Sequence, residues 1–287
     1  MIGKSNLMPS LIFVFTNFNN SDFTEKALRS IQDSDAIDEP VIVVDNGSKE
    51  IEVNKLKELE KQFSNLTVIY NRENLGYFAG LNAGIKEARE LPSYTPKTVL
   101  VVGNNDLLFD RAFKKQIFAD ETLIERYPVI SPNIRMLDGT QQNPHVIEEI
   151  SKVREFIYDI YHTHYLFAGM IVKLAQLTHS FTDRKDEEQF DVEQEIYQGY
   201  GACYLLTAKY FELFDRLPND TFLMYEEFFL AKQLRSKGFK FYYRPTIKIQ
   251  HYCHASTGLI PGKLKWQYSK KAHKEYRKYV KVWSKEY

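Results

Sequence analysis

The chain has 287 residues, 44% of them hydrophobic and 14% aromatic, so it can bury a substantial core in one large or two small domains. Lysine plus arginine equals aspartate plus glutamate at 38 each, which excludes the strong positive field of a nucleic-acid-binding protein. Two cysteines, Cys203 and Cys253, match no disulfide framework or zinc spacing, and no apolar run reaches bilayer length. We therefore expect a cytoplasmic protein without nucleic-acid partners.

Strands and helices alternate in the first part of the chain. Apolar runs predict strands at 11–15, 41–44, 66–70 and 99–102. Helical spacing predicts a helix over 22–31 with Ser21 or Asp22 as its cap, a helix with Ile51, Leu56, Leu59 and Phe63 on one side, and a third ending near Arg89. This alternation predicts a mostly parallel sheet with helices on both faces.

Polar residues follow three of these strands directly. They are Thr16 to Asn19, Asp45 to Ser48, and Asn104 to Asp106. The carboxyl ends of parallel strands share one edge of a sheet, where open α/β proteins bind ligands. Asp106 beside two carboxamides offers oxygen ligands for Mg²⁺ or Mn²⁺, especially if a diphosphate supplies more oxygens. A simple turn is the alternative for any one of them.

The glycines do not fit a dinucleotide site. The loop at 16–20 contains no glycine, so the G-x-G-x-x-G turn of a dehydrogenase is missing, and no phosphate loop of the G-x-x-x-x-G-K-S/T form occurs. Gly76, Gly80 and Gly84 recur every four residues instead. Glycines at this spacing let a helix pack tightly on a sheet or let a ligand approach the backbone.

The second half has a different pattern. Predicted helices lie at 111–127 and 208–214 and from Glu226 to Lys237, where Gly238 ends the last one, and predicted strands lie at 129–134, 240–243 and 247–250, the last two divided by Pro245. The periodicity weakens over 140–196 apart from an apolar segment at 165–174, and the acidic stretch at 183–195 is typical of a solvated loop.

The end of the chain is basic. Residues 258–287 contain nine basic and two acidic residues, a net of +7, against −7 for the first 257 residues. Ala272, Tyr276, Tyr279, Val280, Trp283 and Tyr287 fall on one helical face. Residues 262–287 would contact an anionic membrane surface, or the helix would pack on its own domain or on a second subunit in a homodimer.

Together these segments resemble family 2 glycosyltransferases over about 11–256. Val43-Val-Asp-Asn-Gly-Ser48 is similar to the family's V-V-D-N-G-S segment, and residues 71–84 to its N-x-x-N-x-G-x-x-x-G-x-N-x-G element. Asn104-Asn-Asp106 occupies the place of the D-x-D metal motif, in the N-x-D form of rhamnosyltransferase-like members. Glu226-Glu227 resembles the acidic pair that holds the catalytic base, and His251, with Ser256 behind it, the histidine after the last strand.

The resemblance implies a GT-A fold, a mostly parallel nucleotide-binding sheet flanked by helices, with a smaller acceptor-side region. Residues 1–257 would form the catalytic domain, 1–110 binding the nucleotide sugar and 111–257 facing the acceptor, and 258–287 a helical tail. Asp106 and His251 would hold Mg²⁺ or Mn²⁺. The donor-binding residues would be Thr16, Asn17, Asn19, Asp45, Asn46, Asn74, Gly76, Asn82, Asn104 and Asn105.

Three positions depart from the family pattern. Asn104 replaces the first aspartate of D-x-D, and Glu-Glu replaces the usual Glu-Asp pair at 226–227. The family's T-Y-N after the first strand corresponds either to Asn17-Phe-Asn19 or to a register beginning at Thr16.

The implied activity is inverting transfer of a sugar from a UDP- or dTDP-sugar to a glycan or lipid-linked acceptor in cell-surface polysaccharide synthesis, on the inner face of the plasma membrane. Glu227 would be the general base and Glu226 its partner, or the reverse. Asp106 and Glu227 should then converge on one cleft. A nucleotide-sugar-binding protein without transfer activity is the alternative. A nucleotidylyltransferase would need a glycine-rich basic first loop, which residues 16–20 do not provide.

Overall fold

The computed structural model describes residues 8–178, 186–253 and 262–282. The strands are β1 (Ser10–Asn17), β2 (Val41–Asp45), β3 (Leu66–Tyr70), β4 (Thr98–Asn104), β5 (Leu107–Phe109), β6 (Val129–Met136), β7 (Gln194–Ile196), β8 (Cys203–Leu206) and β9 (Phe241–His251). The helices are α1 (Ser21–Gln32), α2 (Glu50–Gln62), α3 (Tyr77–Glu90), α4 (Phe113–Phe118), α5 (Glu121–Arg126), α6 (Lys152–Thr163), α7 (Tyr165–Thr178), α8 (Ala208–Leu213), α9 (Glu226–Arg235) and α10 (Gly262–Tyr276), with a 3-10 turn η1 (Asp186–Gln189).

One sheet runs through both halves of the chain in the order β3-β2-β1-β4-β8-β6-β9-β5, and β7 pairs with β9. The first four strands are parallel, as predicted from the strand–helix alternation. The second half adds antiparallel pairs at β4–β8, β6–β8 and β5–β9 and a parallel pair at β6–β9. The parallel part of the sheet is therefore built by the alternating first 104 residues, and the mixed part by the rest.

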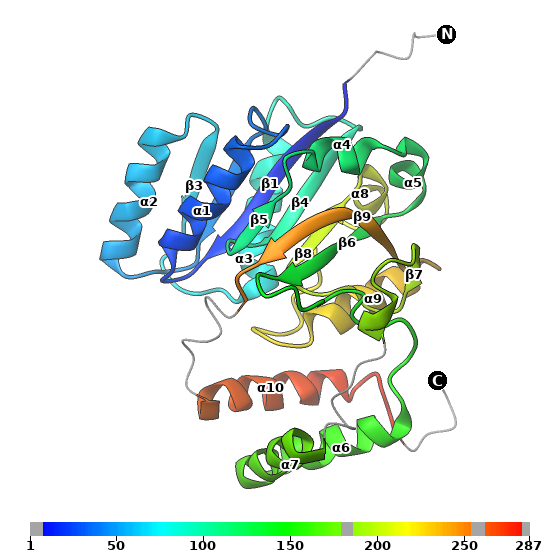
Figure 1. The fold of residues 1–287 in the computed structure, drawn as a ribbon. Coiled ribbons are helices and arrows are strands. Elements are labelled where there is room, and N and C mark those ends of the chain that lie inside the picture. The colour runs from blue at the N-terminus through cyan, green and yellow to red at the C-terminus, as the bar shows by residue number, and fades with distance from the viewer. Residues whose placement is uncertain (1–7, 179–185, 254–261, 283–287) are drawn as a thin grey trace.

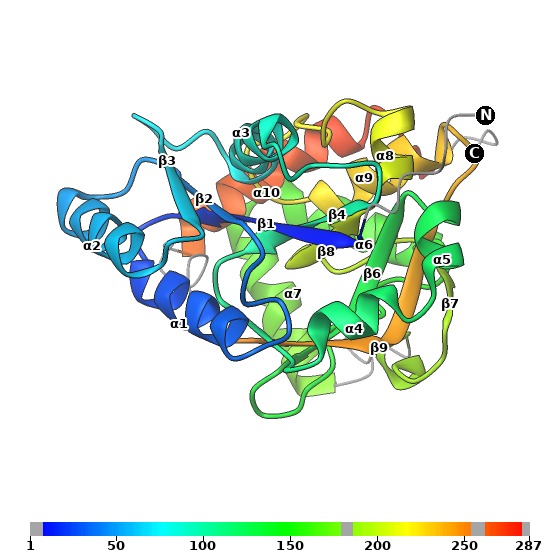
Figure 2. The ribbon, with the colours of Figure 1, turned by 90° about the horizontal axis from the view of Figure 1, so that it is seen from above.

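Helices cover both faces of the sheet (Figures 1 and 2). Leu11, Phe13 and Phe15 of β1 face the core formed with α1, α2 and α4, whereas Ile12 and Val14 face the core formed with α3, α8 and α9. All five side chains are completely buried. A central strand buried on both faces reads as a continuous apolar run, which is why the sequence locates it clearly.

The glycines of α3 allow the close packing that their spacing predicts. A Cβ at Gly84 would lie 2.4 Å from Val14 Cγ1 and 2.9 Å from Val44 Cγ2, on β1 and β2. A Cβ at Gly80 would lie 3.0 Å from Thr16 Cγ2. The backbone of α3 therefore touches side chains of the sheet directly.

Several predicted elements were wrong in detail. The helix expected over 111–127 is two helices, because Asp120 caps α5 by accepting from the backbone amide of Thr122. Pro245 does not divide two strands but lies in an irregularity of β9, where the pairing with β6 shifts between Pro132 and Asn133. Ile51 is exposed, and α1 begins at Ser21 after Asn20, without a side-chain cap.

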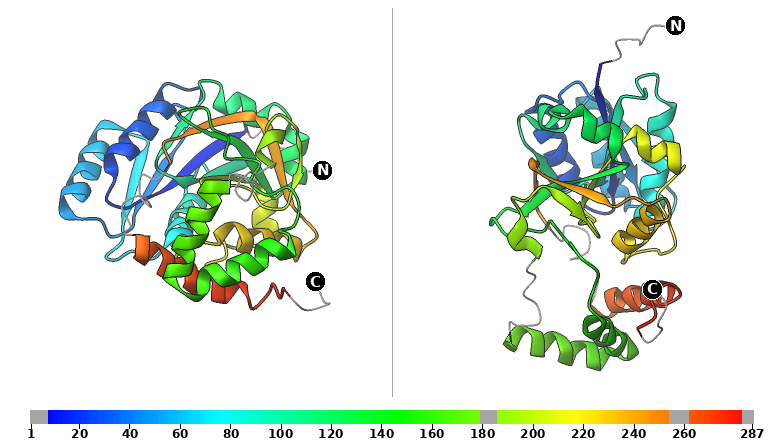
Figure 3. Two further views of the ribbon diagram at one scale, coloured as in Figure 1. Left: turned by 60° about the horizontal axis from the view of Figure 1, so that its bottom comes forward. Right: turned by 90° about the vertical axis from the view of Figure 1, so that its right-hand side faces the viewer.

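Helices α6, α7 and α10 form a layer beside the sheet domain, on the side of the carboxyl ends of β1 and β4 (Figures 1 and 3). The sequence did not predict α6, and α7 contains the expected apolar segment. Ala272 and Tyr276 of α10 are buried, and the Tyr276 ring lies 4.4 Å from that of Phe228 in α9. Trp283 and Tyr287 lie outside the described residues. Within the described ranges, every helix is too short or too polar to cross a bilayer.

Candidate active site

The three polar strand ends meet at one edge of the sheet, as predicted. Thr16 lies opposite Asn104, and Asn17 opposite Asp45, in the parallel ladders. Asn17 Nδ2 donates to Asp45 Oδ1 at 2.9 Å, and Asn105 Nδ2 lies 3.0 Å from Asn17 Oδ1. The ends of β1, β2 and β4 are thus joined by hydrogen bonds between their own side chains.

Asn17 and Asn105 form the buried part of this edge. Both side chains are at most 1% exposed. Asn105 Nδ2 also lies 2.7 Å from Thr24 Oγ1, and Asn105 Oδ1 accepts from Asn20 Nδ2 at 3.1 Å, so its amide is fully engaged with α1 and the loop before it. The structure therefore places Asn17 and Asn105 where they fix the strand ends.

Asp45 is held by this network. Its Oδ1 accepts from Asn17, and its Oδ2 accepts from the backbone amide of Ser48 at 3.1 Å. Asn19, at a positive φ of 54°, accepts from the backbone amide of Lys49 through Oδ1 at 2.8 Å. Thr16 is half-buried at the end of β1. The loops after β1 and β2 are therefore bonded to each other.

Asp106 and His251 form a buried pair. Asp106 Oδ1 lies 3.1 Å from His251 Nε2, and each side chain is only 4% exposed. Gln142 Oε1 lies 2.7 Å from His251 Nδ1, which assigns the proton on Nδ1 to that hydrogen bond. His251 Nε2 then faces the carboxylate either as a second protonated donor or as a lone pair, and Asn104 Nδ2 lies 3.4 Å from the same nitrogen.

This pair fits a divalent cation. Two ligand atoms each ~2.1 Å from one ion and at right angles to it are ~3.0 Å apart, close to the separation of Asp106 Oδ1 and His251 Nε2. A histidine that ligates a metal usually donates its other ring N–H to a partner, as His251 does to Gln142. The described residues contain no cluster of three or more His, Cys, Asp or Glu suited to a metal. Mg²⁺ needs no such cluster, because it is commonly held by one or two carboxylates with substrate phosphates.

The segment before α3 is bonded to β2 and to a later loop. Asn46 Nδ2 donates to the carbonyl of Gly76 at 2.9 Å, and Asn74 Oδ1 accepts from the backbone amide of Gly76 at 2.9 Å. Gly76 has a φ of +92°, and a Cβ there would lie 2.4 Å from the carbonyl oxygen of Phe222. Only glycine fits this position, which joins the segment to residues 220–223.

Asn82 lies away from this edge. Its Nδ2 donates to the carbonyl of Leu217 at 2.9 Å, and its Oδ1 accepts from the backbone amide of Leu217 at 2.8 Å. The pair joins α3 to the loop after α8. The structure therefore brings together the predicted donor residues on the strand ends and at 74–76, but not Asn82.

The paired glutamates begin α9 after a strained turn. Met224 and Tyr225 have φ values of 77° and 67°, a left-handed conformation that costs roughly 1–2 kcal/mol per residue. Glu226 is buried, and its Oε1 accepts from the backbone amide of Met224 at 2.9 Å. Burial, and secondly the charge of Glu227, raise the pKa of Glu226 to about 8. Glu226 is therefore largely protonated at neutral pH.

Glu227 lies against the backbone that leads into β8, the strand paired with β4. A Cβ at Gly201 would be 2.5 Å from Glu227 Oε1, so the carboxylate rests on the backbone just before β8. The next residue, Ala202, accepts through its carbonyl from the backbone amide of Asn104 at 2.9 Å. Glu227 is therefore connected to the end of β4 through Gly201, which it touches, and Ala202, which bonds to Asn104.

Two tyrosines lie within electrostatic reach of both acidic positions. Burial first, and then nearby charges including those of Glu227 and Asp106, raise the pKa of Tyr77 and of Tyr200. Tyr77 Oη donates to the carbonyl of Gly201 at 2.7 Å. The Tyr200 ring lies 6.0 Å from that of His251, the partner of Asp106, and the next residue, Gly201, touches Glu227. Asp106 and Glu227, 121 residues apart in the numbering, are therefore linked through Tyr200 and Gly201.

Sequence reasoning did not find Gln142, Tyr77, Tyr200 or Gly201. Gln142 lies in the segment without clear periodicity, and nothing in its neighbourhood marks it. Tyr77 directly follows the Gly76 position of the recognised element, and Tyr200 and Gly201 begin the segment before β8. The available sequence signal for Tyr77 was its position in the glycine-rich element, and for Tyr200 and Gly201 it was their position before a strand.

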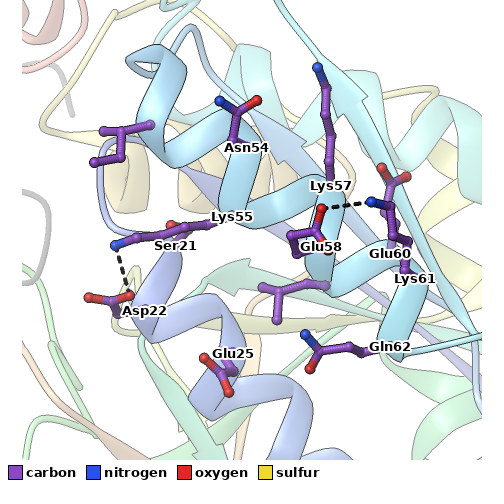
Figure 4. Close-up of a pocket in the computed structure, with 12 residues that line it drawn as sticks. Ser21, Asp22, Glu25, Asn54, Lys55, Lys57, Glu58, Glu60, Lys61 and Gln62 are labelled. Carbon is purple, nitrogen blue, oxygen red and sulfur yellow. Dashed lines mark hydrogen bonds and ion pairs between the residues drawn. The ribbon is translucent and has the colours of Figure 1, made fainter.

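A separate surface hollow lies over α1 and α2 (Figure 4). Its charged side chains pair with one another, as Lys55 does with Asp22 at 3.1 Å and Lys61 with Glu58 at 2.7 Å. None of the predicted site residues lines it. The candidate site is therefore the strand edge and not this hollow.

Comparison with solved structures identifies the fold. The chain is similar to GalNAc-T7 with UDP, GalNAc and Mn²⁺, at a TM-score of 0.57 and 13% identity over 86% of this chain and 44% of that one. It is similar to the mannosyltransferase PcManGT from Pyrobaculum calidifontis in complex with GDP-Man and Mn²⁺, at a TM-score of 0.52 and 14% identity over 86% and 59%. For S. aureus TarS the TM-score is 0.51 with 12% identity, over 82% of this chain and 35% of that one. The chain has the GT-A glycosyltransferase fold, and it spans less than two thirds of each of these three proteins.

Part of the chain matches a known sequence family. Residues 12–118 match the family model of glycosyl transferase family 2. This segment includes Asp45 and Asp106, and the match supports the resemblance that the motifs of the first half indicated. The match ends before Glu226, Glu227 and His251. No curated protein matches the chain.

Proposed function

We propose that this protein is an inverting, metal-dependent glycosyltransferase. It would transfer a sugar from a UDP- or dTDP-sugar to a glycan or lipid-linked acceptor in cell-surface polysaccharide synthesis. The observation that carries the proposal is the position of Tyr200 and Gly201, because the Tyr200 ring lies 6.0 Å from His251 of the Asp106–His251 pair and Gly201 touches Glu227. UDP in the similar GalNAc-T7 structure and GDP-Man in the similar PcManGT structure, each with Mn²⁺, support the same kind of site here.

The Asp106 carboxylate and the His251 imidazole would hold the cation. A bound Mg²⁺ or Mn²⁺ neutralises charge that develops on a departing diphosphate. Gln142 orients the His251 ring through the 2.7 Å contact to Nδ1, so that Nε2 faces the cation position. The polar loops after β1 and β2, with Asp45 held by Asn17 and Ser48, lie where the nucleoside would bind. Asn17 and Asn105 would act by positioning these groups.

Glu227 would act as the general base toward the acceptor hydroxyl. Two adjacent carboxyl groups with separated proton affinities can take distinct roles. Because Glu226 is buried and largely protonated at neutral pH, Glu227 is the member left to carry the negative charge. Proton removal by a positioned carboxylate contributes typically ~10²–10⁴-fold to rate, and direct attack of that hydroxyl inverts the anomeric carbon.

The matched pair Glu227→Gln and Glu226→Gln tests the base. Glu227→Gln is expected to lower kcat by ~10²–10⁴-fold, whereas Glu226→Gln, which resembles the protonated wild-type side chain, is expected to stay within ~10-fold of wild type. Transfer is measured as release of nucleoside diphosphate in the presence of acceptor. The opposite ranking would assign the base to Glu226, and full activity of both variants would end the proposal for this pair.

Metal binding is tested without turnover. Mn²⁺ together with UDP or dTDP is expected to raise the melting temperature of the wild type, because ligands that bind the folded state stabilise it by mass action. Asp106→Ala and His251→Ala should each lose the Mn²⁺-dependent part of that increase. An increase that persists in both variants would place the cation elsewhere.

A nucleotide-sugar-binding protein without transfer activity is the second candidate. Asn104 in place of an acidic residue and the Glu-Glu pair favour it, because both differ from the family pattern. Such a protein would give the same melting-temperature increase but no product with any acceptor. Thermal-shift screening of nucleotide sugars, followed by turnover with the donors that bind, separates the two.

A further inference from the structure

Helix α7 is both apolar and exposed. Lys173 is the charged residue of its 14-residue sequence. Leu166 is nevertheless 69% exposed and Met170 52%, and Phe167 and Val172 are also exposed. Soluble monomers rarely leave contiguous apolar side chains in water, so such a surface marks an interaction site.

Helix α6 also exposes apolar side chains. Val153 and Ile160 are exposed and lie seven residues apart, on one stripe of the helix. Helices α6 and α7 adjoin, with Thr163 ending one and Tyr165 beginning the other. We call the following residues the α6–α7 surface: Val153, Ile160, Leu166, Phe167, Met170 and Val172.

The exposed side chains surround most of α7. At ~100° per residue, Leu166 and Met170 lie ~160° around the helix from Ala168, which is buried against the protein. Phe167 lies ~100° from Ala168 on one side, and Val172 lies ~40° from it on the other. A docked helix or strand covers one stripe of a helix, whereas lipid covers both flanks and the outer face.

An aromatic and cationic group borders the start of α7. Trp266 Nε1 donates to the carbonyl of Tyr161 at 3.0 Å, and its ring lies 5.7 Å from that of Tyr165. Lys270 Nζ donates to the carbonyl of Thr163 at 2.7 Å and lies 4.9 Å from the centre of the Trp266 ring. Tryptophan, tyrosine and lysine are the side chains that occupy the boundary between lipid and water.

Helix α10 supplies more positive charge beside this group. Lys263 is exposed on it and follows Gly262, where a Cβ would lie 3.5 Å from Tyr165 Oη at the start of α7, and α10 packs against α6. Lysines near anionic headgroups each contribute about 1 kcal/mol to membrane binding. The charge next to the apolar side chains therefore favours an anionic lipid surface over a neutral one.

We infer that the α6–α7 surface inserts into the headgroup region of an anionic bilayer while Lys263 and Lys270 of α10 contact the phospholipid headgroups. A helix of 14 residues is ~21 Å long, shorter than the ~30 Å hydrocarbon core, so α7 lies in the plane of the interface. The main apolar contact is then α7 and not the basic helix at the end of the chain. This inference does not depend on the proposed transfer reaction, since it concerns lipid binding alone.

Vesicle flotation of the full chain tests the inference. The wild type is expected to float with vesicles of phosphatidylcholine and phosphatidylglycerol and much less with phosphatidylcholine alone. Leu166→Glu with Met170→Glu should lower the bound fraction by ~10-fold or more. Ile51→Glu, which places one negative charge on an apolar residue exposed on α2, should leave it unchanged.

The charge contribution is tested separately. Lys263→Glu with Lys270→Glu should weaken binding to the anionic vesicles by ~10-fold or more, and added salt should weaken wild-type binding. A Leu166→Trp variant gives a second measurement that does not depend on a disruptive substitution, because its fluorescence should shift to the blue when anionic vesicles are added.

Two results would overturn the inference. One is a wild type that stays in the soluble fraction with both kinds of vesicle and a Leu166→Trp emission that does not move. The other is a stable lipid-free dimer in sedimentation that Leu166→Glu with Met170→Glu dissociates, because the surface would then be covered by a second copy of the chain.

Discussion

Glu226 makes the stability of the protein depend on pH in a way that one substitution can remove. Burial and the neighbouring Glu227 raise its pKa from 4.5 to about 8. A carboxyl group with a higher pKa in the folded state holds more protons there than in the unfolded chain. Its effect on the free energy of unfolding is therefore absent well below pH 4.5 and becomes increasingly destabilising as the pH rises toward 8.

The two pKa values set the magnitude. With 4.5 in the unfolded chain and about 8 in the folded protein, the Glu226 carboxyl destabilises the fold by about 1 kcal/mol at pH 5 and by about 3 kcal/mol at pH 7. Glutamine keeps the shape of the side chain and its acceptor oxygen for the Met224 amide, but it does not ionise. The stability advantage of Glu226→Gln over the wild type should therefore grow with pH.

Denaturant unfolding of both proteins from pH 5 to pH 8 measures this growth. The difference between variant and wild type is the useful quantity, because titrating groups outside the Glu226–Glu227 pair cancel in it. We expect it to increase by about 3 kcal/mol across this range. Glu212→Gln, at an exposed position of α8, should show a constant difference. A pH-independent difference for Glu226→Gln would refute the argument that this group is buried and protonated.

Two further substitutions test the packing of α3 and the attachment of the helical layer. Gly84→Ala should destabilise the protein by about 1–3 kcal/mol in thermal unfolding, because its Cβ would lie 2.4 Å from a methyl of Val14, whereas Gly169→Ala, with open space around it in α7, should be neutral or stabilising. Arg277→Met should leave the buried carboxylate of Glu155 without its 2.7 Å ion pair and destabilise the α6–α10 contact by about 3–5 kcal/mol, which hydrogen exchange in α6 would detect.

The parallel half of the sheet could be predicted because its signals are local. Continuous apolar runs such as 99–102 follow from burial on both faces, and the polar residues after them mark a shared edge. The spacing of Gly76, Gly80 and Gly84 likewise reports contacts that α3 makes through its own backbone. Each of these features depends only on residues that are close together in the sequence, so it can be recognised without knowing which distant residues pack against it.

Helix α6 could not be predicted for the opposite reason. Its inward face carries Glu155 and His162, both buried, whereas its apolar residues Val153 and Ile160 are exposed. The polar side chains are satisfied more than 100 residues later, where Ser269 of α10 bonds to His162 and Arg277, directly after α10, pairs with Glu155. An apolar stripe facing the core is the usual sign of a helix, and α6 has its apolar stripe on the outside.

The sequence also could not show that Asn104 and Asn105 of the candidate site have different roles. One pair of substitutions can test that difference. The motif treats them as equivalent donor-binding carboxamides, but only the structure shows that Asn105 is 1% exposed and bonded to Asn17, Asn20 and Thr24. Asn105→Ala leaves several buried polar groups without a partner and should destabilise the protein by about 2–4 kcal/mol.

Asn104→Ala is the matched control, since Asn104 is half-buried and its side chain makes a 3.4 Å contact to His251 Nε2. It should change the melting temperature little and instead weaken Mn²⁺-dependent nucleotide binding. Equal loss of stability in both variants would show that the buried network does not distinguish the two residues. Unchanged nucleotide binding in Asn104→Ala would remove this side chain from the donor site, because a carboxamide next to the cation position cannot be lost without effect if it contacts the diphosphate.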